Sequence, residues 1–257
     1  MLASMRQLAP DFWNIRGRHR IGGVLDVGTH MSVVRRQNGR FVVVDGCPLD
    51  GAQREALLVL TGKGALVQAV VHVHPFHTLH VEDTHRLFPA AKLYGTARHR
   101  DQSPALPWVG DPVETWDGEH PLADLFELSV PGGVEFVCPD ERVHVASVLV
   151  RARGSGIVHV DDTLNVIAAP GALGRLLPQS ALRMHPMLGR ALRPQAGAAD
   201  AYAAWARALA ARWGETPVVC AAHSAVRMLP AGGFARELEA ALERVARTLD
   251  RHRARYG

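Results

Sequence analysis

"VVHVHPFHTLHVEDTHRLFP", residues 70–89, sets a dense group of histidines directly after an apolar run. The run that leads into it, "ALVQAVV" (65–71), is apolar almost without interruption. Continuous rather than alternating burial is typical of an inner strand covered on both faces. The five histidines of the segment are His72, His74, His77, His80 and His85. Such crowding at the end of a buried strand predicts a site rather than ordinary packing.

The spacing of the first three histidines, HxHxxH, suits a metal ion. His72 and His74 are two residues apart at the end of the predicted strand, where side chains at i and i+2 point the same way. Pro75 then turns the chain, so that His77 can return toward the same place. Two or three imidazoles can therefore reach one ion without distortion of the backbone.

Further metal-ligand candidates occupy similar places along the chain. His144 precedes an apolar run, Asp161 and Asp162 follow "GIVHV", and His223 follows "PVVCAA". Donors at the ends of several strands converge on one edge of a sheet in α/β proteins. Imidazole together with carboxylate suits zinc, iron or manganese better than copper(I). Zinc, as one or two ions, is the favoured cofactor, and iron and manganese stay open.

In this order of residues the chain resembles the metallo-β-lactamase fold superfamily. That family carries HxHxDH after an inner strand, then a lone His, an Asp in "GDT" and a final His. The matching residues here are "HVHPFH" (72–77), His144, "DDTL" (161–164) and His223. "FVVVDG" is similar to the family's "LIDTG" and sets Asp45 at its Asp. The resemblance covers about residues 25–228, and the segment after His74 looks like a branch of the superfamily that brings no known substrate.

The resemblance implies a set of metal ligands. The first ion would take His72, His74 and His144, with Asp162 bridging. The second would keep His77, His223 and Asp162. Asp162 would also act as the catalytic proton acceptor.

Four further residues have defined alternatives in this interpretation. The family's Asp between its second and third histidines is Phe76 here, so the second metal site is the less supported one. His80 could substitute as a ligand, since it would lie one helical turn from His77. Asp161 is the rival of Asp162 for the bridging position. Asp45 is interpreted as a buried structural carboxylate or an outer partner of the ligands.

The remaining histidines are interpreted as surface or hydrogen-bonded core residues. His159 lies on the same strand face as Asp161 and could contact the metal ligands, although packing is favoured, and His30 could line the mouth of the site. The others are His19, His85, His99, His120, His185 and His252.

The fold predicted from the pattern and the resemblance is α/β, an αββα four-layer sandwich of two mixed β-sheets. Hairpins are expected around Asn38-Gly39 and around Gly154–Gly156, because these residues accept tight turns. "LFELSV" (125–130) and "VEFVC" (134–138) read as strands, and residues 97–121 as loop. The chain is expected to form one domain over residues 1–257. A helical insertion is expected at about residues 163–213, and one long helix over "FARELEAALERVARTLDRHR" (234–253).

Composition describes an ordinary globular protein of 257 residues, with 47% hydrophobic and 21% charged residues. Aromatic residues make up only 6%, too few for the basic and aromatic stripe of a nucleic-acid site. Arginine clusters near both ends read as solvated termini. The three cysteines fit buried thiols in a reducing compartment. No apolar run reaches the ~20 residues of a membrane span and the start lacks a signal-peptide core, so a cytoplasmic protein without membrane contact is expected.

The predicted function is that of a metal-dependent hydrolase, in which a metal-activated water attacks an ester, thioester, amide or phosphoester of a small molecule. Two alternatives stay open. One is a mononuclear iron oxidoreductase or dioxygenase on the same fold. The other is a metal-poor, non-catalytic binding module. A homodimer is also left open.

Overall fold

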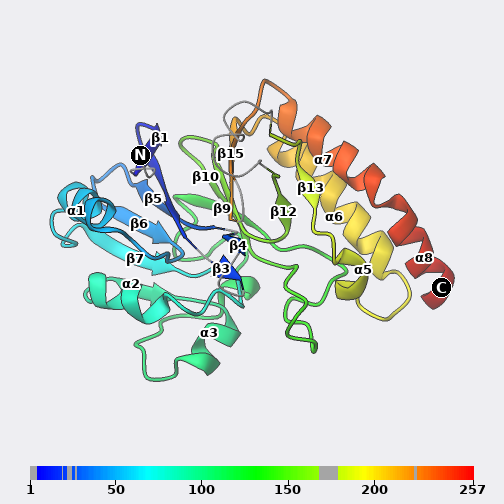
Figure 1. Cartoon of the computed structure of the whole chain (residues 1–257), viewed down its shortest axis with the longest axis horizontal. Coiled ribbons are helices and arrows are strands. Elements are labelled where there is room, and N and C mark those ends of the chain that lie inside the picture. Colours follow the sequence, from blue (N-terminus) through cyan, green and yellow to red (C-terminus); the bar gives the residue numbers. More distant parts are fainter. Residues whose placement is uncertain (1–4, 19, 22–24, 27, 168–178, 223–224) are drawn as a thin grey trace. The chain divides into compact units, whose positions relative to one another are not determined.

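The computed structural model describes the chain except for residues 1–4, 19, 22–24, 27, 168–178 and 223–224 (Figure 1). It forms two compact units. Unit 1 comprises residues 1–128 and 151–155, and unit 2 comprises residues 129–150 and 156–257. The expectation of one domain over the whole chain stays a prediction.

Unit 1 is built on a six-stranded mixed sheet in the order β1-β2-β5-β6-β7-β8. Neighbouring strands are antiparallel from β1 to β6, and β6, β7 and β8 are parallel. The strands are β1 (Arg6–Ala9), β2 (Phe12–Gly17), β5 (Thr29–Arg35), β6 (Phe41–Val44), β7 (Val67–Val71) and β8 (Lys92–Tyr94). A separate antiparallel pair consists of β3 (Arg20–Ile21) and β4 (Leu25–Asp26).

Two predictions for this sheet are confirmed. The β5–β6 hairpin turns at Asn38 and Gly39, where Gly39 has φ +80° and the Asn38 side-chain oxygen accepts the Arg40 amide at 3.0 Å. Strand β7 lies between β6 and β8 and is an inner strand. The sequence does not predict the N-terminal strands β1 and β2, because the arginines in and next to them suggest a solvated terminus. In β2, however, Phe12 and Ile15 are buried in the core.

The helices of unit 1 are α1 (Gly51–Leu60), α2 (Val81–Leu87), α3 (Ala97–Gln102) and the 3-10 turn η1 (Val113–Thr115). Asp50 caps α1, and it forms a reciprocal capping box with Gln53. The prediction that residues 97–121 are all loop is wrong, because α3 begins there. Its start is fixed by a second capping box, in which Thr96 pairs with His99.

Unit 2 holds most of a five-stranded mixed sheet in the order β15-β14-β11-β10-β9. Strands β11 and β14 are parallel, and β14 and β15 are antiparallel. The strands are β9 (Phe126–Ser129), β10 (Leu149–Ala152), β11 (Val158–Val160), β14 (Val218–Ala221) and β15 (Val226–Met228), of which β9 and β10 run across the unit boundary. The hairpin around Gly154–Gly156 and the strand after Thr216 are as predicted. Two mixed sheets with helices confirm the α/β class.

The expected strand at residues 134–138 is wrong. Only Val134 makes an isolated bridge, to Leu192. Gly133, with φ +73°, runs so close to the helix behind it that an added Cβ would lie 2.0 Å from the Ala198 carbonyl oxygen. This segment packs onto a helix and does not pair with a strand, and apolar residues alone do not distinguish the two outcomes.

Helices dominate the later part of unit 2, as α5 (Leu188–Ala191), α6 (Ala198–Trp213), α7 (Gly233–Arg244) and α8 (Ala246–Tyr256). The expectation of helix from residue 163 is wrong for the described residues before α5, where β12 (Leu164–Asn165) pairs with β13 (Arg183–Met184). The expected single terminal helix is also wrong. It breaks at Val245, whose amide donates to the Leu242 carbonyl in a tightened last turn.

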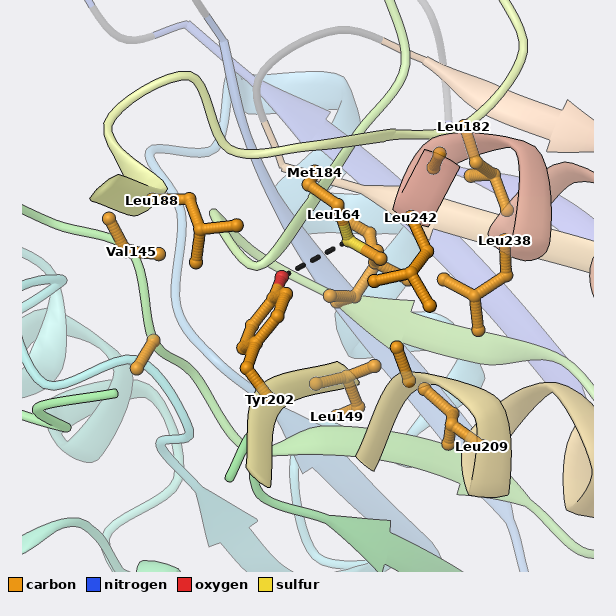
Figure 2. Close-up of a cluster of buried hydrophobic side chains, with 14 of the residues drawn as sticks. Val145, Leu149, Leu164, Leu182, Met184, Leu188, Tyr202, Leu209, Leu238 and Leu242 are labelled. Atoms are coloured by element: carbon orange, nitrogen blue, oxygen red, sulfur yellow. Dashed lines mark hydrogen bonds between the residues drawn. The ribbon is translucent and has the colours of Figure 1, made fainter. Parts of the chain in front are cut away.

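The core of unit 2 lies between α6, α7 and the sheet strands, and Figure 2 shows its side chains. Leu149, Leu164, Leu209 and Leu238 are buried in it. The Tyr202 hydroxyl donates to the Met184 sulfur at 3.1 Å and so keeps a polar group satisfied inside the core (Figure 2). Burial raises the pKa of Tyr202 and holds the hydroxyl neutral.

The three cysteines agree with expectation. Cys47, Cys138 and Cys220 are buried. Burial raises the pKa of the Cys47 thiol to about 12, which makes it unreactive near neutral pH. Among the described residues, no helix has the length and apolarity to cross a bilayer.

The capping box of α1 leads to a stability prediction. Asp50→Ala removes the side-chain acceptor for the Gln53 amide at 2.8 Å, so we expect the free energy of unfolding in urea to fall by about 1 kcal/mol. Glu55→Ala, an exposed change in the same helix, is the control and should leave it nearly unchanged. Equal effects of the two variants would contradict the role of the cap.

Candidate metal centre

His72 directly follows β7, and its surroundings fix its ring. Its amide donates to the Tyr94 carbonyl at 2.9 Å, which extends the pairing of β7 with β8. The side chain is 1% exposed, and Nδ1 lies 3.7 Å from the Asp45 Oδ1. Its Nε2 is buried and has no hydrogen-bond partner among the described residues. A buried nitrogen without a partner, on a ring flanked by a carboxylate, fits a metal ligand, because ligating histidines often place their other nitrogen beside such a group.

Asp45 joins two strand ends of unit 1. It follows β6, is 2% exposed, and has φ +57°. This left-handed conformation is uncommon for a residue with a side chain and marks a constrained position. Its Oδ1 accepts the Val73 amide at 2.9 Å and also faces the His72 ring. This is the placement of a carboxylate that orients a ligand and stabilises the loop.

His74 and His77 are brought together, as the HxHxxH spacing predicts. Their rings stack with centroids 4.1 Å apart, and a ring nitrogen of each lies within 4.8 Å of the other. The His77 amide donates to the His74 carbonyl at 3.0 Å, so a tight turn at Pro75 produces this stacking. His74 is fully buried and His77 is half-buried.

Phe76 lies under a cation. The Arg98 guanidinium carbon is 4.6 Å from the centre of the Phe76 ring, a cation–π contact. The place where the resembled family has a metal-binding carboxylate therefore holds an apolar ring with a positive charge over it. Both features work against a second dication at this point.

The expectation that His80 lies one helical turn from His77 is wrong. Helix α2 begins at Val81, so His77 and His80 both precede it and are not separated by one helical turn. The carbonyl of His80 accepts the Thr84 hydroxyl at 2.7 Å at the start of the helix. Gly46 approaches the same backbone, because an added Cβ would lie 3.0 Å from the His80 carbonyl oxygen.

His99 is the main residue at this place that sequence reasoning missed. Its ring lies 5.3 Å from that of His72 and 6.1 Å from that of Trp108, and it is 1% exposed. The Thr96 amide donates to its Nδ1 at 3.2 Å, so the neutral ring carries its proton on Nε2. Burial, with a smaller effect of His72, lowers the pKa of His99 to about 3. The pattern Thr-x-x-His before a helix was the available signal, because His takes the Glu or Gln position of a capping box.

Unit 2 places both candidate aspartates immediately after β11. Asp161 is 1% exposed and Asp162 is 4% exposed. The side chain of Asn165 donates to the Asp162 carbonyl at 2.9 Å and closes the turn. His159 is fully buried, and one of its nitrogens lies within 4.8 Å of an Asp161 carboxylate oxygen. Two buried carboxylates, one of them beside an imidazole, are unusual in a core and fit a ligand role, and the choice between Asp161 and Asp162 stays a prediction.

His144 does not lead directly into a strand, since β10 begins at Leu149. Its Nε2 contacts the Glu141 carbonyl, to which the ring donates. His223 lies outside the described residues. His30, in β5, is buried, and its Nδ1 lies 3.2 Å from the Asn14 side-chain amide.

No protein-family model matches this sequence, and no curated protein matches it. Solved structures do. The DIM-1 metallo-β-lactamase has 15% sequence identity and a TM-score of 0.61, over 96% of this chain and 100% of that one. A metallo-β-lactamase from Erythrobacter litoralis has 16% identity and a TM-score of 0.55, over 93% and 92%. One from Pontibacter korlensis has 14% identity and a TM-score of 0.58, over 93% and 98%.

These similarities extend over nearly the whole of each chain, and the histidine and aspartate groups lie at the strand ends described above. The chain therefore has the metallo-β-lactamase fold. At this level of identity the likeness concerns the fold, and the chemistry has to be argued from the residues of this chain.

The role of Asp45 can be tested without metal. Asp45→Ala leaves the buried Val73 amide without its acceptor, and alanine is also less tolerant of the left-handed backbone, so we expect a loss of about 1–3 kcal/mol in the free energy of unfolding. Asp45→Asn keeps an acceptor oxygen and should lose clearly less. Urea unfolding of the metal-free protein measures both. Equal losses would show that the hydrogen bond to Val73 is unimportant.

Proposed function

We propose that this chain is a metal-dependent hydrolase of the metallo-β-lactamase fold that acts on an ester, thioester, amide or phosphoester of a small molecule. The observation that carries the proposal is His72, whose buried Nε2 has no hydrogen-bond partner among the described residues and whose Nδ1 faces Asp45. The stacked pair of His74 and His77 follows within the same turn and supports it.

The proposed ligands divide into two groups. His72, His74 and His144 would hold a first ion, with Asp162 bridging to a second ion held by His77 and His223. Zinc is the proposed metal, since imidazole and carboxylate donors suit it, and iron and manganese are the alternatives. When bound, such an ion makes water nucleophilic near neutral pH and polarises the substrate oxygen.

The residues of the chain would supply positioning and proton transfer. Asp162 is the proposed proton acceptor, because a carboxylate at the edge of the metal centre can take the proton that water loses. Asp45 would orient His72, and the turn at Pro75 would present His74 and His77 together. The contact of Arg98 with Phe76 supports uneven occupancy, with the His72 group filled first. We expect lactamase and general phosphodiesterase activity to be weak for this reason.

The second candidate is a mononuclear iron oxidoreductase or dioxygenase. Phe76 in place of a carboxylate favours it, because one ion with few protein ligands keeps open positions for oxygen or a thiol. A metal-poor binding module is the third hypothesis. Elemental analysis of the purified protein distinguishes them, as two zinc ions, one iron ion or no metal per chain.

The proposed setting is the cytoplasm, which the three buried cysteines support. The proposed partner is a small-molecule substrate, without nucleic acid or membrane, and a homodimer stays an open proposal.

Loss of a ligand should lower metal binding. His72→Ala and Asp162→Ala each remove a proposed donor and should weaken zinc binding at least tenfold. His85→Ala, on α2, is the control and should bind as the wild type does. Competition with a chromophoric chelator measures all three affinities. Wild-type affinity in both ligand variants would rule out this ligand assignment.

The Phe76 position allows a sharper test. Phe76→Asp restores a carboxylate and should raise the affinity of the second zinc ion, but Arg98 would compete for the new charge. We therefore expect a larger gain in the double variant Phe76→Asp, Arg98→Ala, and no gain in Arg98→Ala alone. Calorimetric titration of zinc into the apo proteins gives the number and strength of sites. Two equally tight sites in the wild type would contradict the account of Phe76.

A further inference from the structure

A cavity of about 810 Å³ lies within unit 2, and none of its lining residues is assigned above to metal binding or catalysis. One wall is the face of α8 that carries Thr248, Arg251 and Arg255. The opposite wall is formed by α5 with its flanking residues and by the segment after Val134. Helices α5 and α8 pack against each other (Figure 1). The volume is in the range of small-molecule binding sites.

The lining combines an apolar floor with a cationic face. Val143 and Leu192 are buried, and Met187 adds a flexible apolar side chain. Arg251 and Arg255 are four residues apart on α8, so both guanidinium groups lie on the same side of the helix. Like charges at this spacing repel, and an anion in the cavity would relieve that repulsion.

The two arginines are held in place without an acidic partner. Among the described residues neither forms an ion pair. The Arg251 Nε donates to the Arg247 carbonyl at 3.1 Å, and the Arg255 guanidinium lies 5.2 Å from the centre of the Tyr256 ring. Arg253, between them in sequence, instead pairs with two aspartates at 2.8 and 2.7 Å. Carboxylates thus balance the charge of Arg253. Among the described residues, Arg251 and Arg255 have no such partner.

The acidic residues of the lining do not cancel this charge. Asp140 is already paired with Arg142 at 2.9 Å and with Arg190. Glu135, the other acid of the lining, forms no ion pair among the described residues, so one acid remains against two arginines. The cavity is therefore cationic on its α8 side and apolar on its floor.

We propose that this cavity binds an organic anion with an apolar body, a carboxylate or phosphate monoester whose head contacts Arg251 and Arg255. The apolar part would lie against Val143, Met187 and Leu192. The proposal is independent of the metal centre. It also gives the C-terminal arginine cluster a role other than that of a solvated terminus.

Calorimetry of the full chain with four probes tests the proposal. Octanoate and octyl phosphate carry the same apolar tail with different heads, octanol lacks the charge, and inorganic phosphate lacks the tail. We expect saturable one-to-one binding of at least one octyl anion, and binding of octanol and of inorganic phosphate at least tenfold weaker. The stronger octyl anion identifies the head group. No saturable binding of either octyl anion, or equal binding of octanol, would overturn the proposal.

Matched variants locate the site. Arg251→Gln and Arg255→Gln should each weaken the bound octyl anion roughly tenfold, the effect of one charge-assisted contact. Arg247→Gln is the control, because Arg247 lies on the same stripe of α8 but does not line the cavity. Circular dichroism checks the fold of each variant. Unchanged affinity in the double variant Arg251→Gln, Arg255→Gln would overturn the assignment, and the octanoate and octanol comparison on the wild type stands if a variant fails to fold.

Discussion

The carboxylate of Asp45 is the constraint on which the candidate metal centre depends. One oxygen of this buried group accepts the Val73 amide and lies 3.7 Å from the His72 ring, so it ties the end of β6 to the residues after β7. The contact holds although Asp45 must adopt a left-handed backbone conformation, which costs free energy for most residues. The surrounding strands compensate, because β6 and β7 are paired along their lengths in the buried part of the sheet.

Around this contact the chain packs imidazoles into a nearly dry environment. His72, His74 and His99 are each 1% exposed or less. Burial disfavours the charged ring, and the low pKa of His99 is its consequence here. Neutral imidazole is the form that binds metal ions. Trp108 and Asp45 complete the surroundings of His72 and leave its Nε2 as the group still to be satisfied.

The helices of unit 2 bury apolar side chains on one side and carry charged side chains on the other. The inner faces of α6 and α7 bury alanine and leucine side chains against the sheet, and Tyr202 satisfies its hydroxyl within that core. On α8 only Leu249 and His252 are buried, and its arginines are exposed or partly exposed. Where carboxylates are near, as at Arg253, the charge is paired. Among the described residues Arg251 and Arg255 have no carboxylate partner, and the proposed anion would supply one.

Much of the fold and part of the site were open to prediction because their signals are local. The apolar run before His72 predicts an inner strand, Asn38-Gly39 predicts a hairpin, and Asp50 predicts the start of α1. The HxHxxH spacing also predicts the meeting of His74 with His77, since only one turn separates them. Contacts between distant segments were not accessible in this way. That Val134 packs onto a helix, that His99 lies against His72, and that Arg98 covers Phe76 depend on which surfaces meet when the chain folds. Periodicity and spacing report the environment of a residue along the chain. Which residues of distant segments contact it is decided only by tertiary packing.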